Sequence, residues 1–241
     1  MTDAEAWDRI AAARTASVAV ASVQYGPDLP TETELRLCGD VAGKRVLDLG
    51  CGGGENAVAF ARQGAHVIGL DASTGQLARG KRLAEANEVR VEWQRSDAAD
   101  LAFLRADSMD VAFASGLLSE IEDIDRLFRQ VHRLLRPGAP FVFSYEHPIA
   151  LTIARDVASA GALPLGRLEV RRSYFEPGPL VVDVEGEEIT LWPRTIAEVF
   201  AALHRAGYRV DMLLEPEAVR SADPGPSTPS TIIWRARKEG V

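Results

Sequence analysis

Short apolar segments alternate with longer amphipathic segments along this chain, and that alternation is the feature that most restricts its fold. From Lys44 onward, five runs rich in Val and Ile read KRVLDLG, AHVIGLD, VRVEWQ, MDVAFAS and APFVFSYE. Between them, ENAVAFARQ, TGQLARGKRLAEAN and DIDRLFRQVHRLLR place apolar residues on one helix face. This pattern is typical of strands joined by crossover helices, and it predicts a doubly wound α/β fold.

The alternation of apolar and amphipathic segments changes after Pro148, where an insertion is expected rather than a second domain. ALTIARDVASAGAL has helical spacing, and LEVRRSYFE and EEITLW resemble strands separated by PGP and an acidic turn. A helix is predicted over residues 194–206, ended by Gly207. Two more strand segments, YRVDMLLE and TIIWRARK, flank the turn-rich loop SADPGPSTP.

Charge and cysteine content exclude several classes of function. Asp and Glu number 35 against 27 Lys and Arg, a formal net charge of -8, and no long basic run offers a footprint for nucleic acid. The two cysteines, Cys38 and Cys51, lack the paired spacing of a zinc site or a disulfide framework. The N-terminal segment matches neither a signal peptide nor a membrane span. We therefore expect a soluble cytoplasmic protein with no metal and no nucleic-acid or membrane partner; its oligomeric state is not predicted.

The segment VLDLGCGGGENA, residues 46–57, places a glycine loop between the first predicted strand and the next helix. Missing side chains let a ligand approach the backbone at the carboxyl end of that strand. The dinucleotide fingerprint would require glycine where Glu55 stands, and a carboxylate there would repel a pyrophosphate. No Gly-Lys-Ser/Thr follows, so the phosphate-loop pattern also fails. The loop therefore favours a nucleoside over a phosphate.

Two aspartates after the next strands refine this expectation. Asp71 ends the second predicted strand, at the spacing where a carboxylate can accept hydrogen bonds from ribose hydroxyls. Asp97 follows the third strand on the same sheet edge and could accept from an exocyclic amine. Together they indicate adenosine.

Four motifs occur in register between about Lys44 and Glu146: DLGCGGG, GLDAS, SDA and LLRPG. This combination resembles the S-adenosylmethionine-dependent methyltransferases of the Rossmann-like class. The C-terminal pattern is similar to the small-molecule branch of that family. The resemblance implies a seven-stranded, mostly parallel sheet with an antiparallel last strand, a cap insertion between strands five and six, and S-adenosylmethionine as cofactor.

The resemblance also implies roles for individual residues. Asp48 would position the ammonium of the methionine moiety, Asp71 would take the ribose hydroxyls, and Asp97 would meet the adenine amine. Tyr25, ahead of the first strand, resembles a position that closes over the methionine end. The complete implied cofactor site is Tyr25, Asp48, Gly50, Cys51, Gly52, Asp71, Ala72, Asp97, Ala98, Ser115 and Gly116.

The whole chain, residues 1–241, is then expected to form one methyltransferase domain in four regions. Residues 1–43 would form a helical lid region and residues 44–147 the cofactor-binding core. Residues 148–193 would cap the substrate and exclude water, and residues 194–241 would add the C-terminal helix and strands.

His147 is the candidate catalytic base, because it directly follows the fifth strand and its ordinary pKa suits proton abstraction near neutral pH. The alternative is that it only orients substrate or caps the turn at Pro148. Glu146 is a weaker candidate base. Many relatives carry a histidine pair after the fourth strand, but LSEI stands here, so no mechanism is transferred from that pair. Candidate substrate contacts are Trp7, Glu120, Tyr174 and Trp192.

The sequence predicts methyl transfer to a small molecule, with oxygen favoured over nitrogen or carbon as acceptor, and secondary metabolism as a possible setting. One alternative is a relative that binds S-adenosylmethionine without transferring methyl, as a pericyclase or a binding protein. A nicotinamide oxidoreductase on a similar sheet is a third interpretation, disfavoured by Glu55.

Overall fold

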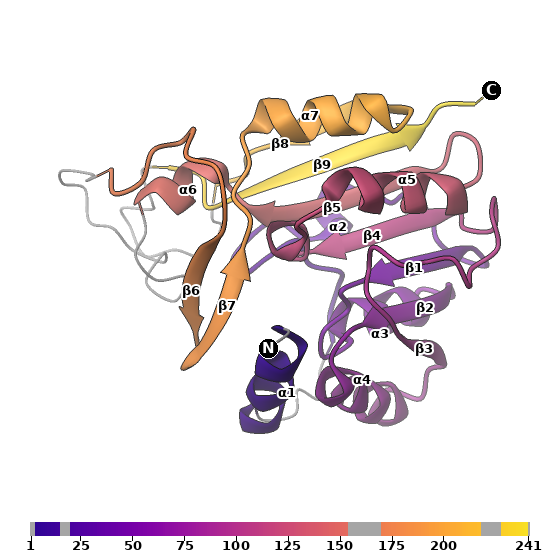
Figure 1. Cartoon of the computed structure of the whole chain (residues 1–241). Coiled ribbons are helices and arrows are strands. Elements are labelled where there is room, and N and C mark those ends of the chain that lie inside the picture. The colour runs from indigo at the N-terminus through magenta and orange to yellow at the C-terminus, as the bar shows by residue number, and fades with distance from the viewer. Residues whose placement is uncertain (1–2, 15–19, 154–169, 218–227, 241) are drawn as a thin grey trace.

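The computed structural model describes residues 3–14, 20–153, 170–217 and 228–240, and it confirms the predicted α/β fold. Seven strands form one sheet in the order β3-β2-β1-β4-β5-β9-β8 (Figure 1). Only β9 runs antiparallel to its neighbours, as the resemblance implied. The strands are β1 (Arg45–Leu49), β2 (His66–Asp71), β3 (Val91–Arg95), β4 (Val111–Ser115), β5 (Pro140–Glu146), β8 (Tyr208–Leu214) and β9 (Thr231–Lys238).

The order in which strands are added to the sheet reverses at β1. This strand pairs with β2 on one side and with β4 on the other. Leu49 at the end of β1 is in register with Leu70 of β2 and Ala114 of β4. The carboxyl ends of these strands therefore meet at one sheet edge. In open α/β sheets this switch point is where ligands bind.

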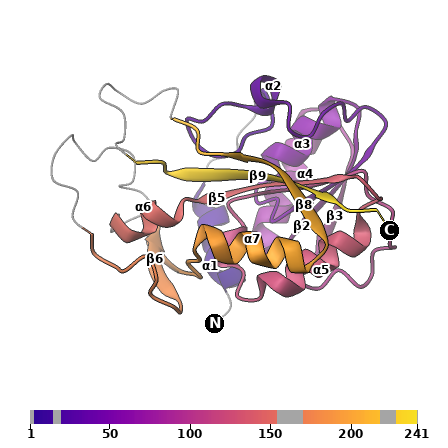
Figure 2. The same ribbon diagram turned by 90° about the horizontal axis from the view of Figure 1, so that it is seen from above.

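Helices cover both faces of the sheet, as Figure 2 shows for α5 and α7 on one face and α2 and α3 on the other. Two separate apolar clusters fill the layers. One joins the sheet to α5 and α7 around Phe128 and Phe143, and the other joins it to α3 and α4 around Phe60. The helices are α2 (Glu32–Leu35), α3 (Glu55–Arg62), α4 (Thr74–Ala86), α5 (Ile124–Leu134) and α7 (Ile196–Arg205). In the described part of the chain, no helix is long and apolar enough to cross a membrane.

The insertion contains a helix and a hairpin, and one predicted strand in it was wrong. α6 (Pro148–Ile153) begins the predicted helix, whose remainder lies outside the described residues. The partner of β7 (Glu187–Leu191) is not LEVRRSYFE but β6 (Leu180–Val184), beyond the PGP segment. Residues 170–176 instead form turns, in which the Arg172 guanidinium donates to the carbonyls of Glu176 and Gly178. The loop SADPGPSTP lies largely outside the described residues.

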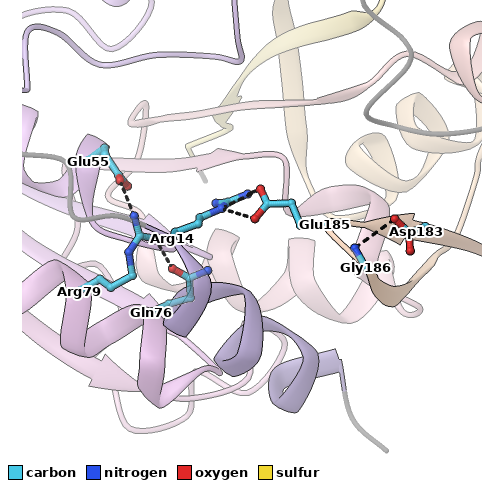
Figure 3. A network of polar contacts seen from close by, with 7 residues as sticks. All are labelled: Arg14, Glu55, Gln76, Arg79, Asp183, Glu185 and Gly186. Atoms are coloured by element: carbon cyan, nitrogen blue, oxygen red, sulfur yellow. Dashed lines mark hydrogen bonds and ion pairs between the residues drawn. The ribbon is translucent and has the colours of Figure 1, made fainter.

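The N-terminal helix α1 (Asp3–Ala13) joins the hairpin to the core domain beyond the carboxyl ends of the strands (Figure 1). Its Ala6 and Ile10 pack against Val182 and Ile189 of the hairpin. Figure 3 shows the Arg14 guanidinium, just after α1, donating to the Glu185 carboxylate at the tip of the hairpin at 2.6 Å.

Asp8 fixes the other side of α1 to the start of α4. Its Oδ1 accepts from the Ser73 hydroxyl at 2.6 Å and from the Gly75 N–H at 2.7 Å. Burial opposes ionisation of Asp8, but the hydrogen bonds from Ser73, Gly75 and Thr74 and the charge of Arg95 together outweigh it and lower the pKa of this carboxyl. The docking of α1 should therefore weaken as the pH falls through that lowered pKa.

We expect Asp8→Ala to release α1 from α4 while the sheet stays folded. Hydrogen bonds to an ionised group contribute about 1.5–3 kcal/mol each, so exchange of the α1 amides should become about tenfold faster or more. Hydrogen–deuterium exchange measures this directly. Glu5→Ala is the matched control, because Glu5 is an exposed acidic residue on the same helix. Equal exchange in the two variants would contradict the anchoring role of Asp8.

Candidate active site

A cavity of about 970 Å³ opens at the switch point, between the carboxyl ends of the strands, α1 and the hairpin. Its floor follows the loops after four neighbouring strands, and its outer wall is apolar. The lining residues include Gly50, Cys51, Gly52, Asp71, Ala72, Asp97, Ala98, Ser115, Gly116, Trp7, Glu120, Glu146, Val182, Val184, Ile189 and Leu191.

Asp71 holds the glycine loop against the end of β2. Its Oδ2 accepts from the Gly52 N–H at 2.8 Å, and its Oδ1 accepts from the Ser73 N–H at 2.9 Å. Burial raises the pKa of Asp71, and these backbone donors oppose the rise by stabilising the ionised form. Each carboxylate oxygen has a second lone pair, so the group can still accept from a diol in the cavity.

The glycines of the loop serve different purposes. Gly52 has a φ of +52°, and a Cβ built there would meet no atom within 4 Å. Its backbone therefore faces open cavity, where a ligand can approach it closely. At Gly54, with a φ of +84°, a Cβ would lie 2.6 Å from the Trp93 ring and 2.8 Å from the Gly80 Cα. That glycine is required by the packing of α3 on α4, not by a ligand.

Asp48 supplies a buried acceptor at the floor of the cavity. The side chain is buried, and its Oδ2 has no hydrogen-bond partner among the described residues. Burial raises the pKa of Asp48 well above its ordinary value, and the charges of Asp71 and Glu55 add to the rise. A cationic donor in the cavity would satisfy this oxygen. The orphaned Oδ2, the open Gly52 edge and Asp71 together fit an ammonium-bearing nucleoside such as S-adenosylmethionine.

Asp97 and Ala98 extend this edge beyond β3. The Asp97 Oδ1 accepts from the Ala99 N–H at 2.7 Å, so this aspartate stabilises its own turn. The side chain is exposed to the cavity, and its other oxygen can accept from an amine. Turn formation and amine recognition are therefore compatible at Asp97.

Two carboxyl groups face the cavity at the other end, after β4 and β5. Glu120 ends the short 3-10 helix η1 (Leu118–Glu120), and its Oε2 accepts from the Trp7 indole N–H at 2.8 Å. Glu146 ends β5, and its Oε2 accepts from the Ser119 hydroxyl at 2.5 Å. Burial raises the pKa of Glu120 to about 8, and the nearby Glu146 carboxyl adds to the rise. Burial also raises the pKa of Glu146, although the Ser119 hydrogen bond opposes it.

Comparison with known proteins identifies the family. A model described as a methyltransferase domain matches residues 46–138. The structure of an S-adenosylmethionine-dependent methyltransferase from Mesorhizobium loti is 32% identical, with a TM-score of 0.69 over 84% of this chain and 94% of that chain. This chain belongs to the S-adenosylmethionine-dependent methyltransferases. A second such structure, described as a putative methyltransferase from Listeria monocytogenes, is 25% identical, with a TM-score of 0.70 over 86% of this chain and 95% of that one.

Curated relatives of this methyltransferase are similar over shorter stretches. The ubiquinone biosynthesis O-methyltransferase of Hahella chejuensis is 36% identical over 102 residues, which cover 42% of this chain and 43% of that protein. The enzyme of the same name from Acinetobacter baumannii strain AYE is 35% identical over 165 residues, 64% of this chain and 66% of the relative. This chain therefore spans less than half the length of the first of these relatives.

The structure brings together all but one of the residues expected to bind the methyltransferase cofactor. The exception is Tyr25, whose buried ring packs on Phe113 and whose hydroxyl donates to Glu32. Those contacts lie in the layer between the sheet and α3, away from the cavity lining. Tyr25 therefore serves the core in this structure.

His147 does not line the cavity either. It is buried, its Nδ1 accepts from the Ile149 N–H at 3.1 Å, and its Nε2 lies 2.8 Å from Glu215 Oε1. With Nδ1 accepting, the proton resides on Nε2, which donates to Glu215. Both ring nitrogens are thus engaged, and the contacts favour the alternative that His147 caps the turn at Pro148 rather than acting as a base.

Of the four predicted substrate contacts, the structure places two on the cavity. Trp7 and Glu120 line it and are bonded to each other. The Tyr174 hydroxyl instead accepts from the Ile196 N–H at 3.1 Å, where α7 begins. Trp192 lies behind Glu146, and its backbone N–H donates to the Ser119 carbonyl at 2.6 Å. Neither of these last two residues is among those that line the cavity.

Sequence reasoning missed part of the apolar wall. Val182 and Val184 line the cavity from β6, a strand that was not predicted. The alternation in LVVDVEGEEITL, two short segments around Glu185-Gly186, was a hairpin signal that could have identified both residues.

The pKa of Glu120 predicts a specific pH dependence of stability. Between its ordinary value of 4.5 and about 8, the unfolded chain has lost the Glu120 proton while the folded protein retains it. The contribution of Glu120 to the free energy of unfolding must therefore fall as the pH rises through this window. Because Gln does not titrate, Glu120→Gln should gain melting temperature over the wild type at pH 8 relative to pH 5. Thermal unfolding at both pH values measures this, with the exposed Glu122→Gln as control; identical pH slopes for wild type and E120Q would contradict it.

Proposed function

We propose that this methyltransferase methylates a hydroxyl oxygen of a small, largely apolar and uncharged acceptor. The observation that carries the proposal is the continuity of the cavity, which runs from Asp48 and Asp71 to an apolar chamber with Glu120 and Glu146. The names of the curated relatives, ubiquinone biosynthesis O-methyltransferases, agree with oxygen as acceptor. A role in secondary metabolism and a cytoplasmic location stay predictions from the sequence.

The two carboxyl groups supply the acid–base chemistry that a hydroxyl acceptor needs. S-adenosylmethionine, when bound, supplies a methyl group on a sulfonium that is already activated for displacement. Glu146 would take the hydroxyl proton, with Ser119 holding one of its oxygens so that the other can face the acceptor. Glu120 stays protonated at neutral pH because its pKa is about 8. The pair then carries one negative charge, which avoids two buried carboxylates repelling each other.

The wall of the chamber determines which acceptors fit. Ile189, Leu191 and Val182 of the hairpin present apolar surface and exclude water from the reacting atoms. Among the described residues that line the cavity, the two basic side chains are Arg14, which pairs with Glu185, and Arg95, whose Nε donates to the Ala72 carbonyl at the end expected to hold the nucleoside. An anionic acceptor would therefore meet carboxyl groups without a paired cation, so neutral acceptors should be preferred.

A panel of phenols tests this function. Calorimetry first measures binding of S-adenosylmethionine and of its demethylated product to the full chain. Mass spectrometry then detects acceptors that gain one methylene, using each neutral phenol beside its carboxylate-bearing analogue. Cofactor binding with no methylated product from any acceptor would favour a binding protein or a pericyclase over a transferase. Preferential methylation of the carboxylate-bearing analogues would overturn the proposed acceptor class.

A further inference from the structure

The hydrogen bond between Trp7 and Glu120 connects two parts of the chain that are 113 positions apart. Trp7 belongs to α1, which forms one side of the cavity, whereas Glu120 belongs to η1, which follows β4 in the core domain. The other side-chain bonds of α1 in the described part of the chain run to the start of α4, through Asp8, and to the hairpin, through Asp3 and Arg9. Among these described contacts, Trp7 is therefore the one through which α1 reaches an acidic group of the acceptor chamber.

The Trp7 side chain has two separate functions in this contact. Its ring packs against the apolar cluster of α1 and the hairpin and so helps to close the wall. Its indole N–H meets a carboxyl oxygen inside the cavity. Packing on the hairpin needs only an apolar side chain, so packing alone does not account for the polar edge of the ring.

We propose that Trp7 is a positioning residue, whose N–H orients the Glu120 carboxyl toward the acceptor only when α1 is docked over the cavity. This inference deepens the proposed function, on which it rests for the role of Glu120. Docking of α1 and alignment of the two carboxyl groups, Glu120 and Glu146, then occur together. An acceptor meets Glu120 correctly oriented only after the apolar wall has excluded water from the chamber.

The surroundings of Glu120 make this one donor important. The charged groups that act on it are Glu146 of β5, Asp71 of β2 and Asp3 of α1, all acidic. The hairpin opposite presents the apolar Ile189 and Leu191. Arg194, ahead of α7, donates instead to the backbone carbonyls of Ile121 and Glu122. The Trp7 N–H is thus the favourable partner of the Glu120 carboxyl among the described residues, and it lowers a pKa that burial raises.

The titration of Glu120 in the cofactor-free protein tests the bond without any methyl transfer. Carbon-13 NMR of the glutamate carboxyls gives its pKa, with the Glu120 resonance assigned by its loss in Glu120→Gln. In Trp7→Phe, which keeps an aromatic body but removes the donor, the pKa should rise by about one pH unit, the equivalent of one hydrogen bond. Trp93→Phe is the matched control, because it makes the same change at a tryptophan that does not line the cavity. Equal Glu120 titrations in W7F and wild type, or equal shifts in W7F and W93F, would overturn the proposal.

A second measurement follows the Trp7 indole N–H in the wild-type chain, with W7F used for its assignment and E120Q for comparison. The sequence has four tryptophans, and the indole N–H resonance that disappears in W7F belongs to Trp7. In the wild type this resonance should move with pH in step with Glu120, and in E120Q it should lose that movement. An indole resonance that stays constant across the titration would contradict the proposal. Because neither readout needs turnover, loss of the positioning role is distinguishable from failure of the proposed methyl transfer.

Discussion

Glu146→Gln should lower kcat by about 10²–10⁴-fold, the usual contribution of a general base, while the Kd of S-adenosylmethionine changes little. The amide keeps the size of the side chain but cannot accept a proton from the acceptor hydroxyl. Cofactor affinity should persist, because Glu146 lies at the end of β5, whereas the glycine loop is held by Asp71 at the end of β2. Steady-state kinetics with a neutral phenol and calorimetry with the cofactor separate the two effects.

The pH profile provides a second readout for Glu146. In the wild type, kcat should fall as the pH drops through the pKa of Glu146, which burial raises above 4.5. This acid limb should be absent from the residual activity of E146Q. Glu122→Gln, a change of the same kind at an exposed site, is the control. If His147→Gln rather than E146Q abolished turnover with cofactor binding intact, the base would be His147, as the sequence first suggested.

Asp71→Asn should weaken S-adenosylmethionine binding by about 10–100-fold, the equivalent of losing one or two charge-assisted hydrogen bonds. The Asp71 carboxylate accepts from both Gly52 and Ser73, whereas an amide has one oxygen and must turn its NH₂ toward one of these donors. The glycine loop then loses its anchor, and the cavity loses an acceptor for the ribose hydroxyls.

Calorimetry with the cofactor and with its demethylated product measures the effect of D71N. Both ligands contain the ribose, so both should lose affinity by a similar factor. Asp100→Asn is the matched control, because Asp100 is exposed and does not line the cavity. A Kd in D71N within about threefold of the wild type would contradict the role of Asp71, since a single charge-assisted bond is worth more than that.

Local sequence patterns made much of the end of the cavity expected to bind the cofactor predictable. The glycine loop and Asp71 each lie within one strand–loop–helix unit, where side-chain direction follows from the period of the strand and the position of the turn. The parallel sheet then brings the ends of β1 and β2 to one edge in any chain with this order of elements. Contacts of this kind need no knowledge of the rest of the molecule.

The end of the cavity proposed for the acceptor was less predictable, because it depends on which way a side chain points at the end of a strand. Glu146 and His147 are neighbours, and sequence reasoning preferred His147 for its ordinary pKa. Successive side chains of a strand point to opposite sides, so only one of the two can face the cavity. In the structure Glu146 faces it, whereas His147 turns toward Glu215. Burial then raises the pKa of Glu146, and this shift cannot be predicted without knowing the fold.

The family, the sheet and the edge that carries the glycine loop were predictable from the sequence, because each of these rests on short, contiguous motifs. The chamber proposed for the acceptor became visible only in the folded molecule. Its wall comes from a hairpin whose first strand, β6, was not recognised, and the hydrogen bond from Trp7 to Glu120 joins residues that are 113 positions apart. Such a contact follows from how α1 packs on the hairpin and on α4, and packing between distant segments leaves no periodic pattern in the sequence.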